Sequence, residues 1–180
     1  AVVTIGRSNS EFYRRAGVRA DRTFGGAYFV DNEHFLAMLA RHGDTASGSV
    51  TDLPTPVTFA FYGKHVAFKR PDMLVEAAGK LVHQGMPVRL RFAGSGEMTA
   101  QLQARCIALG VEAEFVGFLN QTEMWRAYVG ADVFVLPSTH RETWGLVANE
   151  AMLFGLPIIV SDQVGSGPDL VIHGQTGWVF

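Results

Sequence analysis

The chain has 180 residues, of which 48% are hydrophobic and 18% are charged, so it can bury a sizeable core and has the composition of an ordinary globular protein. Its 15 basic and 17 acidic side chains nearly balance, which excludes a strong net field that would attract nucleic acid or anionic lipid. The single cysteine, Cys106, excludes an internal disulfide and fits a reducing compartment.

The first 50 residues are predicted to form a lead-in, because they are too short for a domain of their own. They are expected to comprise a strand over 2–8, a short helix over 10–18, a helix over 31–43 opened by Asp31 or Asn32, and a polar connection over 43–56. Both chain ends lie within strand-like segments, so we expect a fragment of a longer protein. The predicted division is a lead-in over 1–50 and a folded domain over 51–180.

From residue 57 onward, strand-like and helix-like segments alternate. Strands are predicted over 57–62, 88–94, 112–118, 131–138 and 156–162, and helices over 70–85, 97–110, 121–130 and 146–155. Helices between strands favour βαβ units and a parallel sheet, and apolar runs such as VFVL and PIIV suit strands covered on both faces. The predicted fold class is α/β, a doubly wound Rossmann-like parallel sheet.

The loop after the first of these strands, YGKHVAFKRPD, concentrates positive charge. It contains Lys64 and Lys69, two of the three lysines in the chain, with Arg70 next to them. Ligands of open parallel sheets bind beyond the carboxyl ends of the strands, and cations beside a helix start suit a pyrophosphate. A solvated basic loop explains the same residues equally well.

The next such loop, AGSGEM, contains Gly94 and Gly96, which permit a tight turn and close approach of a ligand to the backbone. The third glycine of the dinucleotide-binding fingerprint is absent, because position 99 is threonine. A plain tight turn is therefore at least as good an interpretation.

The loop LPSTHRETWG leads into a helix that is predicted to begin near Gly145. The free amides of Gly145, Leu146 and Val147 form an anion site at the positive end of the helix dipole. Glu150 lies one turn into the helix and can accept hydrogen bonds from a vicinal diol such as a ribose, whereas Glu142 precedes the helix and can face a group beyond the phosphate. Two glutamates at a helix end are also common as plain surface residues.

In combination, these segments resemble the retaining glycosyltransferases of family 4, which have the GT-B fold. The resemblance is carried by two glutamates separated by seven residues, followed by AMLFGLPIIVSD, VGSGPDLV and GQTGWVF, and by the upstream segments FYGKHVAFKRPDMLVEA, LRFAGSGE and FVGFLNQTEMWRAYVGADVFVLPS. It covers residues 57–180, and more loosely 28–35. It implies that the chain is the C-terminal, donor-binding half of a GT-B fold.

The resemblance also implies roles for the residues named above. Glu150 binds the ribose of a nucleotide sugar, Glu142 contacts the donor sugar, Lys64 and Lys69 bind the diphosphate with the backbone of Gly145, Leu146 and Val147, Val116 and Phe118 border the base, and Gly94 and Gly96 form the glycine loop. Two positions depart from the family pattern. Lys64 stands where arginine is common and loses the bidentate fork, and Arg70 stands where glycine is usual.

The implied reaction transfers a glycosyl group from a nucleoside-diphosphate sugar, with retention, to an unknown saccharide or lipid-linked acceptor. No Asp-x-Asp motif is present, so metal independence is predicted, and no cofactor beyond the donor is expected. The acceptor pocket belongs to an N-terminal domain that this chain is expected to lack, so donor binding without turnover is anticipated. A cytoplasmic location is expected, with any peripheral contact to the inner face of the membrane made by the missing half.

Two alternatives remain at this point. The first is a non-catalytic nucleotide- or carbohydrate-binding module. The second is a nicotinamide-dependent oxidoreductase domain, which the missing third glycine and the lack of an acidic residue at the end of the second strand disfavour.

Overall fold

The computed structural model describes residues 1–26, 28–43, 56–140 and 142–180. Its main feature is a parallel sheet of six strands in the order β5-β4-β3-β6-β7-β8, the doubly wound order, which confirms the predicted fold class. The strands are β3 (Val57–Tyr62), β4 (Val88–Ala93), β5 (Glu112–Gly117), β6 (Val133–Leu136), β7 (Ile158–Val160) and β8 (Gly177–Val179).

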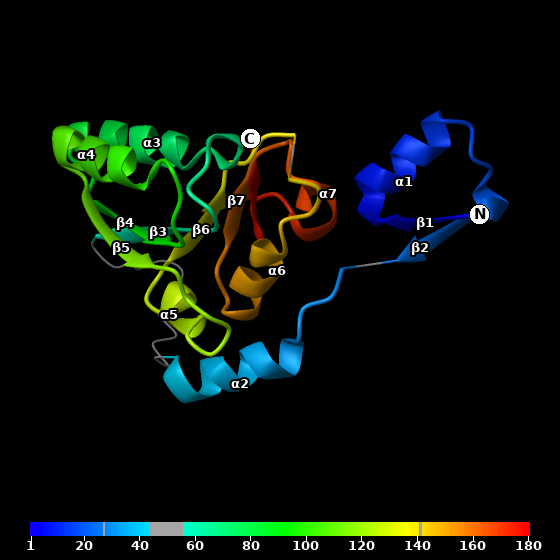
Figure 1. Ribbon diagram of the computed structural model, residues 1–180, viewed down its shortest axis with the longest axis horizontal. Helices are drawn as coiled ribbons and strands as arrows, with labels where there is room; N and C mark the ends of the chain where they lie inside the picture. Colours follow the sequence, from blue (N-terminus) through cyan, green and yellow to red (C-terminus); the bar gives the residue numbers. More distant parts are fainter. Residues whose placement is uncertain (27, 44–55, 141) are drawn as a thin grey trace.

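Helices cover both faces of this sheet, as Figure 1 shows. On one face, α3 (Pro71–His83) and α4 (Thr99–Leu109) pack over a core that includes Phe61, Leu90 and Phe92. On the other face lie α5 (Trp125–Tyr128), α6 (Leu146–Leu153) and α2 (Asn32–His42), over a second core that contains Phe134 and Ile158. Strand residues alternate between the two cores, which explains why the strands are almost continuously apolar.

The N-terminal residues form a small unit beside the short helix α7 (Gly167–Leu170). Strands β1 (Val2–Ile5) and β2 (Thr23–Gly26) pair in parallel around α1 (Gly6–Arg15), with a short 3-10 helix η1 (Ala20–Arg22) before β2. The amide of Arg7 donates to the Asp169 carboxylate of α7 (3.0 Å to Oδ2) and thereby ties this unit to the sheet domain.

The predicted helix over 10–18 was wrong at its start, because α1 begins at Gly6 and takes residues that were predicted as strand. Gly6 has a φ of 73° and turns the chain directly into the helix, and the carboxylate that accepts from the Arg7 amide lies 162 residues away. Strand β2, with the sequence TFGG, was not predicted, since its two glycines have low strand propensity.

Two other expectations concern helix ends. The helix predicted over 121–130 is shorter, because the Asn120 side chain accepts from the amides of Thr122 and Glu123 and holds a turn there. The helix over 31–43 is confirmed, with Asp31 accepting from the His34 amide at 3.0 Å. Most of the predicted polar connection over 43–56, with the division at residue 50, lies outside the described residues. Within the described ranges, no helix has the length and apolar character needed to cross a membrane.

Candidate functional site

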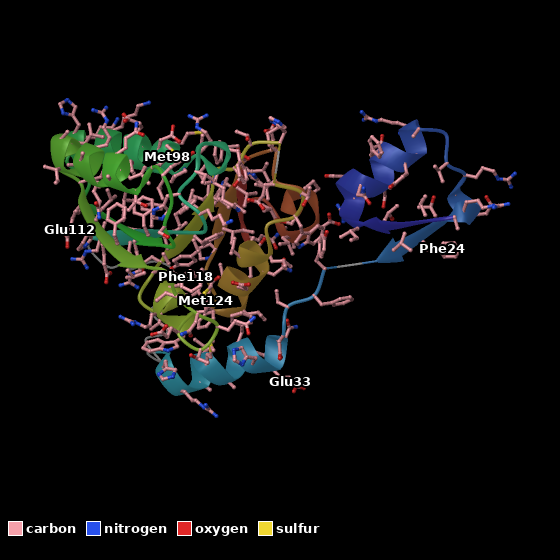
Figure 2. All side chains as sticks on the ribbon, in the orientation of Figure 1. Phe24, Glu33, Met98, Glu112, Phe118 and Met124 are labelled. Atoms are coloured by element: carbon pink, nitrogen blue, oxygen red, sulfur yellow. The ribbon has the colours of Figure 1, made fainter. Side chains whose placement is uncertain are left out.

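A pocket of about 340 Å³ lies at the carboxyl ends of β3, β4 and β5 and at the first turn of α6. Its lining combines backbone of two glycine-containing loops with aromatic and apolar side chains: Tyr62, Gly63, Lys64, Ala93, Gly94, Ser95, Phe118, Leu119, Met124 and Val147. Figure 2 shows Phe118 and Met124 between β5 and α5, on the side of the sheet that faces α2. The adjacent strands β3 and β6 connect to helices on opposite faces, so this edge is where the sheet topology reverses and where such folds bind ligands.

A second, larger groove of about 510 Å³ lies between α3 and the sheet. The described residues that line it are all apolar, among them Met73, Leu81 and Phe180. Since orientation of a polar ligand needs polar groups, the candidate site is the smaller pocket.

Gly94 and Gly96, both predicted as site residues, explain how the loops after β3 and β4 pack together to form one side of the pocket. An ideal Cβ on Gly94 would lie 2.1 Å from the Gly63 carbonyl oxygen, and one on Gly96 would lie 2.4 Å from the His65 carbonyl oxygen. The Gly94 backbone also has a φ of 106°. The close approach that these glycines permit is therefore to the loop after β3, and Gly94 in addition lines the pocket.

The other side of the pocket is the start of α6. Gly145 precedes the helix in a left-handed conformation, with a φ of 86°, and its ideal Cβ would lie 2.6 Å from Cδ2 of Leu136. The amides of Leu146 and Val147 follow in the first turn, where amides have no partner inside the helix. Val147 lines the pocket, so the positive end of this helix dipole faces it.

Lys69 and Glu142 form an ion pair beside the pocket. Lys69 Nζ lies 2.5 Å from Glu142 Oε2, and the two side chains are only 16% and 13% exposed. Ser138, fully buried at the end of β6, donates to the same carboxylate oxygen at 3.0 Å. The Lys69 stem passes 3.3 Å from an ideal Cβ on Gly63, which places the ion pair next to the pocket wall.

Glu150 lies on the inner side of α6, where the buried hydroxyl of Tyr128 donates to its Oε2. Burial raises the pKa of Glu150, and the Tyr128 hydrogen bond lowers it in part. Tyr128 packs edge-on against Tyr62, with ring centroids 4.6 Å apart, and Tyr62 lines the pocket. The carboxylate is thus connected through two tyrosines to the floor of the pocket, one turn beyond Val147.

Some of the predicted site residues line the pocket, and others lie next to it. Lys64, Gly94, Phe118 and Val147 line one pocket, whereas Val116 is half-buried and packs against the core next to it. Phe118 is 79% exposed at the pocket mouth, free to present its ring to a planar ligand.

Three polar side chains of the site were not predicted: Ser138, Tyr128 and His65. Ser138 precedes Glu142 by four residues and follows a buried strand, a position that could have indicated it. Tyr128 and His65 gave no such signal, because their partners Glu150 and Thr99 are 22 and 34 residues away.

Comparison with known proteins agrees with this geometry. The sequence matches, over residues 49–180, the family described as glycosyl transferases group 1. An uncharacterised glycosyltransferase of Methanocaldococcus jannaschii is 37% identical over 123 residues, which cover 67% of this chain and 31% of that protein. The D-inositol 3-phosphate glycosyltransferase of Corynebacterium aurimucosum is 36% identical over 175 residues, which cover 81% of this chain and 40% of that protein. The chain therefore spans well under half the length of these relatives.

Solved structures show the same fold. HepE of Anabaena, crystallised with UDP and glucose, superposes with a TM-score of 0.70 over 99% of this chain and 48% of that one, at 20% identity. TarM superposes with a TM-score of 0.73 over 100% of this chain and 33% of that one, at 16% identity. The resemblance to the GT-B glycosyltransferases that the sequence predicted is thus confirmed, and the chain belongs to the glycosyl transferases of group 1.

Proposed function

We propose that this chain is the donor-binding half of a retaining glycosyltransferase and that its pocket holds a nucleoside-diphosphate sugar. The observation that carries the proposal is the grouping of charge at the switch point: Lys64 at the pocket wall, the Lys69–Glu142 ion pair beside it, and Glu150 on the first turns of α6. Cations and helix-end amides suit a diphosphate, and a carboxylate suits vicinal hydroxyls.

Under this proposal, each part of the donor is assigned to a different region of the site. The base lies at Phe118 and Val116, the ribose reaches Glu150, and the diphosphate lies between Lys64 and the first amides of α6. The sugar then extends toward Glu142, with Lys69 beside both. The Anabaena protein was solved with UDP-glucose, and a Mycobacterium tuberculosis relative, 32% identical over 109 residues, is named as GDP-mannose-dependent. Relatives with uridine and guanosine donors both support a nucleoside diphosphate and leave the base to measurement.

In the transfer step, the bond between the anomeric carbon and the diphosphate breaks as the acceptor oxygen bonds to that carbon on the same face, and the proton of the acceptor hydroxyl passes to the leaving diphosphate. Negative charge grows on the leaving diphosphate, and Lys64, Lys69 and the amides at Gly145, Leu146 and Val147 stabilise it. These groups supply positive charge without a divalent ion, in keeping with the lack of an Asp-x-Asp motif in the sequence. Glu142, held by Lys69 and Ser138, orients the sugar hydroxyls.

The acceptor, a saccharide or a lipid-linked sugar, binds to the part of the protein that lies outside this chain. The chain by itself then binds donor without transferring it, because half of a cleft neither holds an acceptor nor excludes water. The whole enzyme acts in the cytoplasm, where activated sugars are made, with any peripheral membrane contact made by its other half.

Calorimetric titration with UDP, GDP, ADP and NAD tests the proposal. We expect one nucleoside diphosphate to bind in preference to NAD, and Lys64→Gln to weaken that binding. Lys80→Gln is the matched control, because Lys80 is exposed on α3 away from the pocket and its substitution removes the same charge. Preference for NAD would favour an oxidoreductase. Equal effects of the two lysine substitutions would show that Lys64 acts only through the net charge of the chain and not through a contact in the pocket.

Metal independence has its own measurement. Titration of the preferred nucleotide with and without EDTA, and with added Mg²⁺, is expected to give one dissociation constant within twofold. Loss of binding on chelation would contradict the metal-free assignment while leaving the donor site in place.

A further inference from the structure

His65 is a fully buried histidine at the wall of the candidate site. It directly follows Lys64 in the loop after β3, and its exposed fraction is 0%. Three phenyl rings surround its imidazole, those of Phe61, Phe92 and Phe115, with centroids 5.7 to 6.1 Å away. Burial of a polar ring in such surroundings costs free energy unless the ring is hydrogen-bonded.

The hydrogen-bond network defines which nitrogen carries the proton. Thr99 Oγ1 donates its one hydrogen to the Gly96 carbonyl at 2.8 Å and accepts from the Gly96 amide at 3.0 Å. Since that hydrogen is already used, we assign the 2.9 Å contact between His65 Nδ1 and Thr99 Oγ1 as a donation from Nδ1–H. The ring is then the neutral Nδ1–H tautomer, and Nε2 is a buried acceptor with no partner among the described residues.

The surroundings keep the ring neutral. Burial lowers the pKa of His65. The ring neighbours from β3, β4 and β5 are phenylalanines and the one from α4 is a threonine, so none of these contacts titrates.

The main chain of the same residue joins the two loops of the pocket. The His65 amide donates to the Ser95 carbonyl at 3.0 Å, and the Met98 amide donates to the His65 carbonyl at 3.0 Å. The imidazole adds a third connection, through Thr99 to the peptide groups of Gly96. Lys64 lies between this junction and Gly63, whose amide donates to Ala93 at 3.1 Å.

We infer that His65 is a positioning residue of the donor site: its neutral imidazole, acting through Thr99, fixes the glycine loop against the loop after β3 and so holds Lys64 toward the donor diphosphate. This inference rests on the proposed function. His65 does not itself touch the ligand, and its effect is exerted on the diphosphate and not on the base. An aliphatic side chain fills the same space between the rings but leaves the Thr99 hydroxyl without its donor.

The test compares nucleotides that differ by one phosphate. UDP and UMP, and GDP and GMP, are titrated into the wild type and into Thr99→Val, which keeps the shape but removes the hydroxyl, with Thr99→Ser as the variant that keeps the hydroxyl. His65→Leu removes the donor from the other side, and His65→Asn returns an N–H near the Nδ1 position. Melting temperatures are measured for every variant.

We expect Thr99→Val and His65→Leu to bind the preferred diphosphate about tenfold more weakly while the monophosphate affinity changes by less than twofold. Thr99→Ser is expected to behave as wild type, and His65→Asn to recover part of the loss. Unchanged diphosphate affinity in folded Thr99→Val would overturn the inference and leave the proposed function intact, as would equal loss for both nucleotides, which indicates a structural role. If the wild type binds none of the four, the proposed function fails, and the inference with it.

Discussion

The two sides of the candidate pocket are held together by different forces. On the side of Gly63 and Gly94, the loops touch through their main chains, and burial lowers the pKa of the His65 imidazole, which favours the neutral ring. On the side of β6 and α6, the contacts are between charged or strongly polar side chains, Lys69 with Glu142 and Tyr128 with Glu150. Main-chain packing is rigid and insensitive to pH. Burial of a charged side chain costs free energy unless the charge is paired and hydrogen-bonded. We therefore call the first side the frame and, under the proposed function, the second side the active wall.

The sharpest way to break the frame is Gly94→Ala. The new Cβ would lie 2.1 Å from the Gly63 carbonyl oxygen, at a backbone φ of 106° that alanine rarely adopts. We expect the free energy of unfolding to fall by about 3–5 kcal/mol, from the strained backbone and the clash together. Gly110→Ala is the control, because Gly110 has a φ of 66° but open space around it, and about 1 kcal/mol is expected there. Urea denaturation of both variants measures the difference, and similar losses would remove the argument from loop packing.

On the active wall, Lys69→Gln leaves the Glu142 carboxylate largely buried and without its counter-ion. Removal of one partner of a mostly buried pair is expected to cost about 2–3 kcal/mol of folding stability. Lys64→Gln is the matched comparison, since Lys64 is exposed and its loss should leave the melting temperature unchanged. Both variants should bind a nucleoside diphosphate more weakly. An equally stable Lys69→Gln would show that the ion pair contributes nothing to the fold.

Glu150→Gln should separate stability from binding. Because the pKa of Glu150 is raised in the folded protein, its contribution to stability is present below its unfolded pKa, about 4.3, and is lost as the pH rises through the folded value. The glutamine variant should therefore be more stable than wild type at pH 8 and gain less at pH 5. It should bind nucleotide about tenfold more weakly, since a charged acceptor has been removed. Thermal melts at both pH values, with calorimetry, measure the two effects, and a destabilised variant at pH 8 would contradict the account.

The smallest effect concerns the neutral histidine of the frame. The pKa of His65 is lowered, so its contribution to stability is full above its unfolded pKa of about 6.5 and decreases as the pH falls below it. His65→Asn lacks this titration, so the stability difference between wild type and variant should shrink between pH 7 and pH 5. The other histidines are present in both proteins and cancel in that difference. A difference that is constant across this range would argue against a buried neutral ring.

Much of the fold could be predicted because its signals are local. Strand β3 was predicted with the bounds that the structure has, since VTFAFY is mostly apolar and rich in residues that favour strands, and both its faces are buried. The helix after Gly145 was predicted from a glycine followed by an apolar run, and the structure shows this glycine in a left-handed conformation at the start of α6. The start of α1 could not be predicted, because the Arg7 amide in its first turn donates to Asp169, near the other end of the chain.

The candidate site divides in the same way. The spacing of Glu142 and Glu150 and the clustering of Lys64 and Lys69 were visible in the sequence, and the pocket brings Lys64 together with residues of two other loops and of the first turn of α6. The partners of these side chains, such as Tyr128 for Glu150, were not visible, since they depend on how a helix on one face meets a neighbouring one. The glycines were recognised as sites of close approach, but the sequence could not show that their nearest neighbour is another loop.

A crystal structure of this chain with the nucleoside diphosphate that binds most tightly tests the central claim most directly. The account predicts the diphosphate between Lys64 and the first amides of α6, the ribose hydroxyls within hydrogen-bond distance of Glu150, and the base against Phe118. A nucleotide bound elsewhere, for instance in the apolar groove beside α3, or one whose ribose does not approach Glu150, would contradict it.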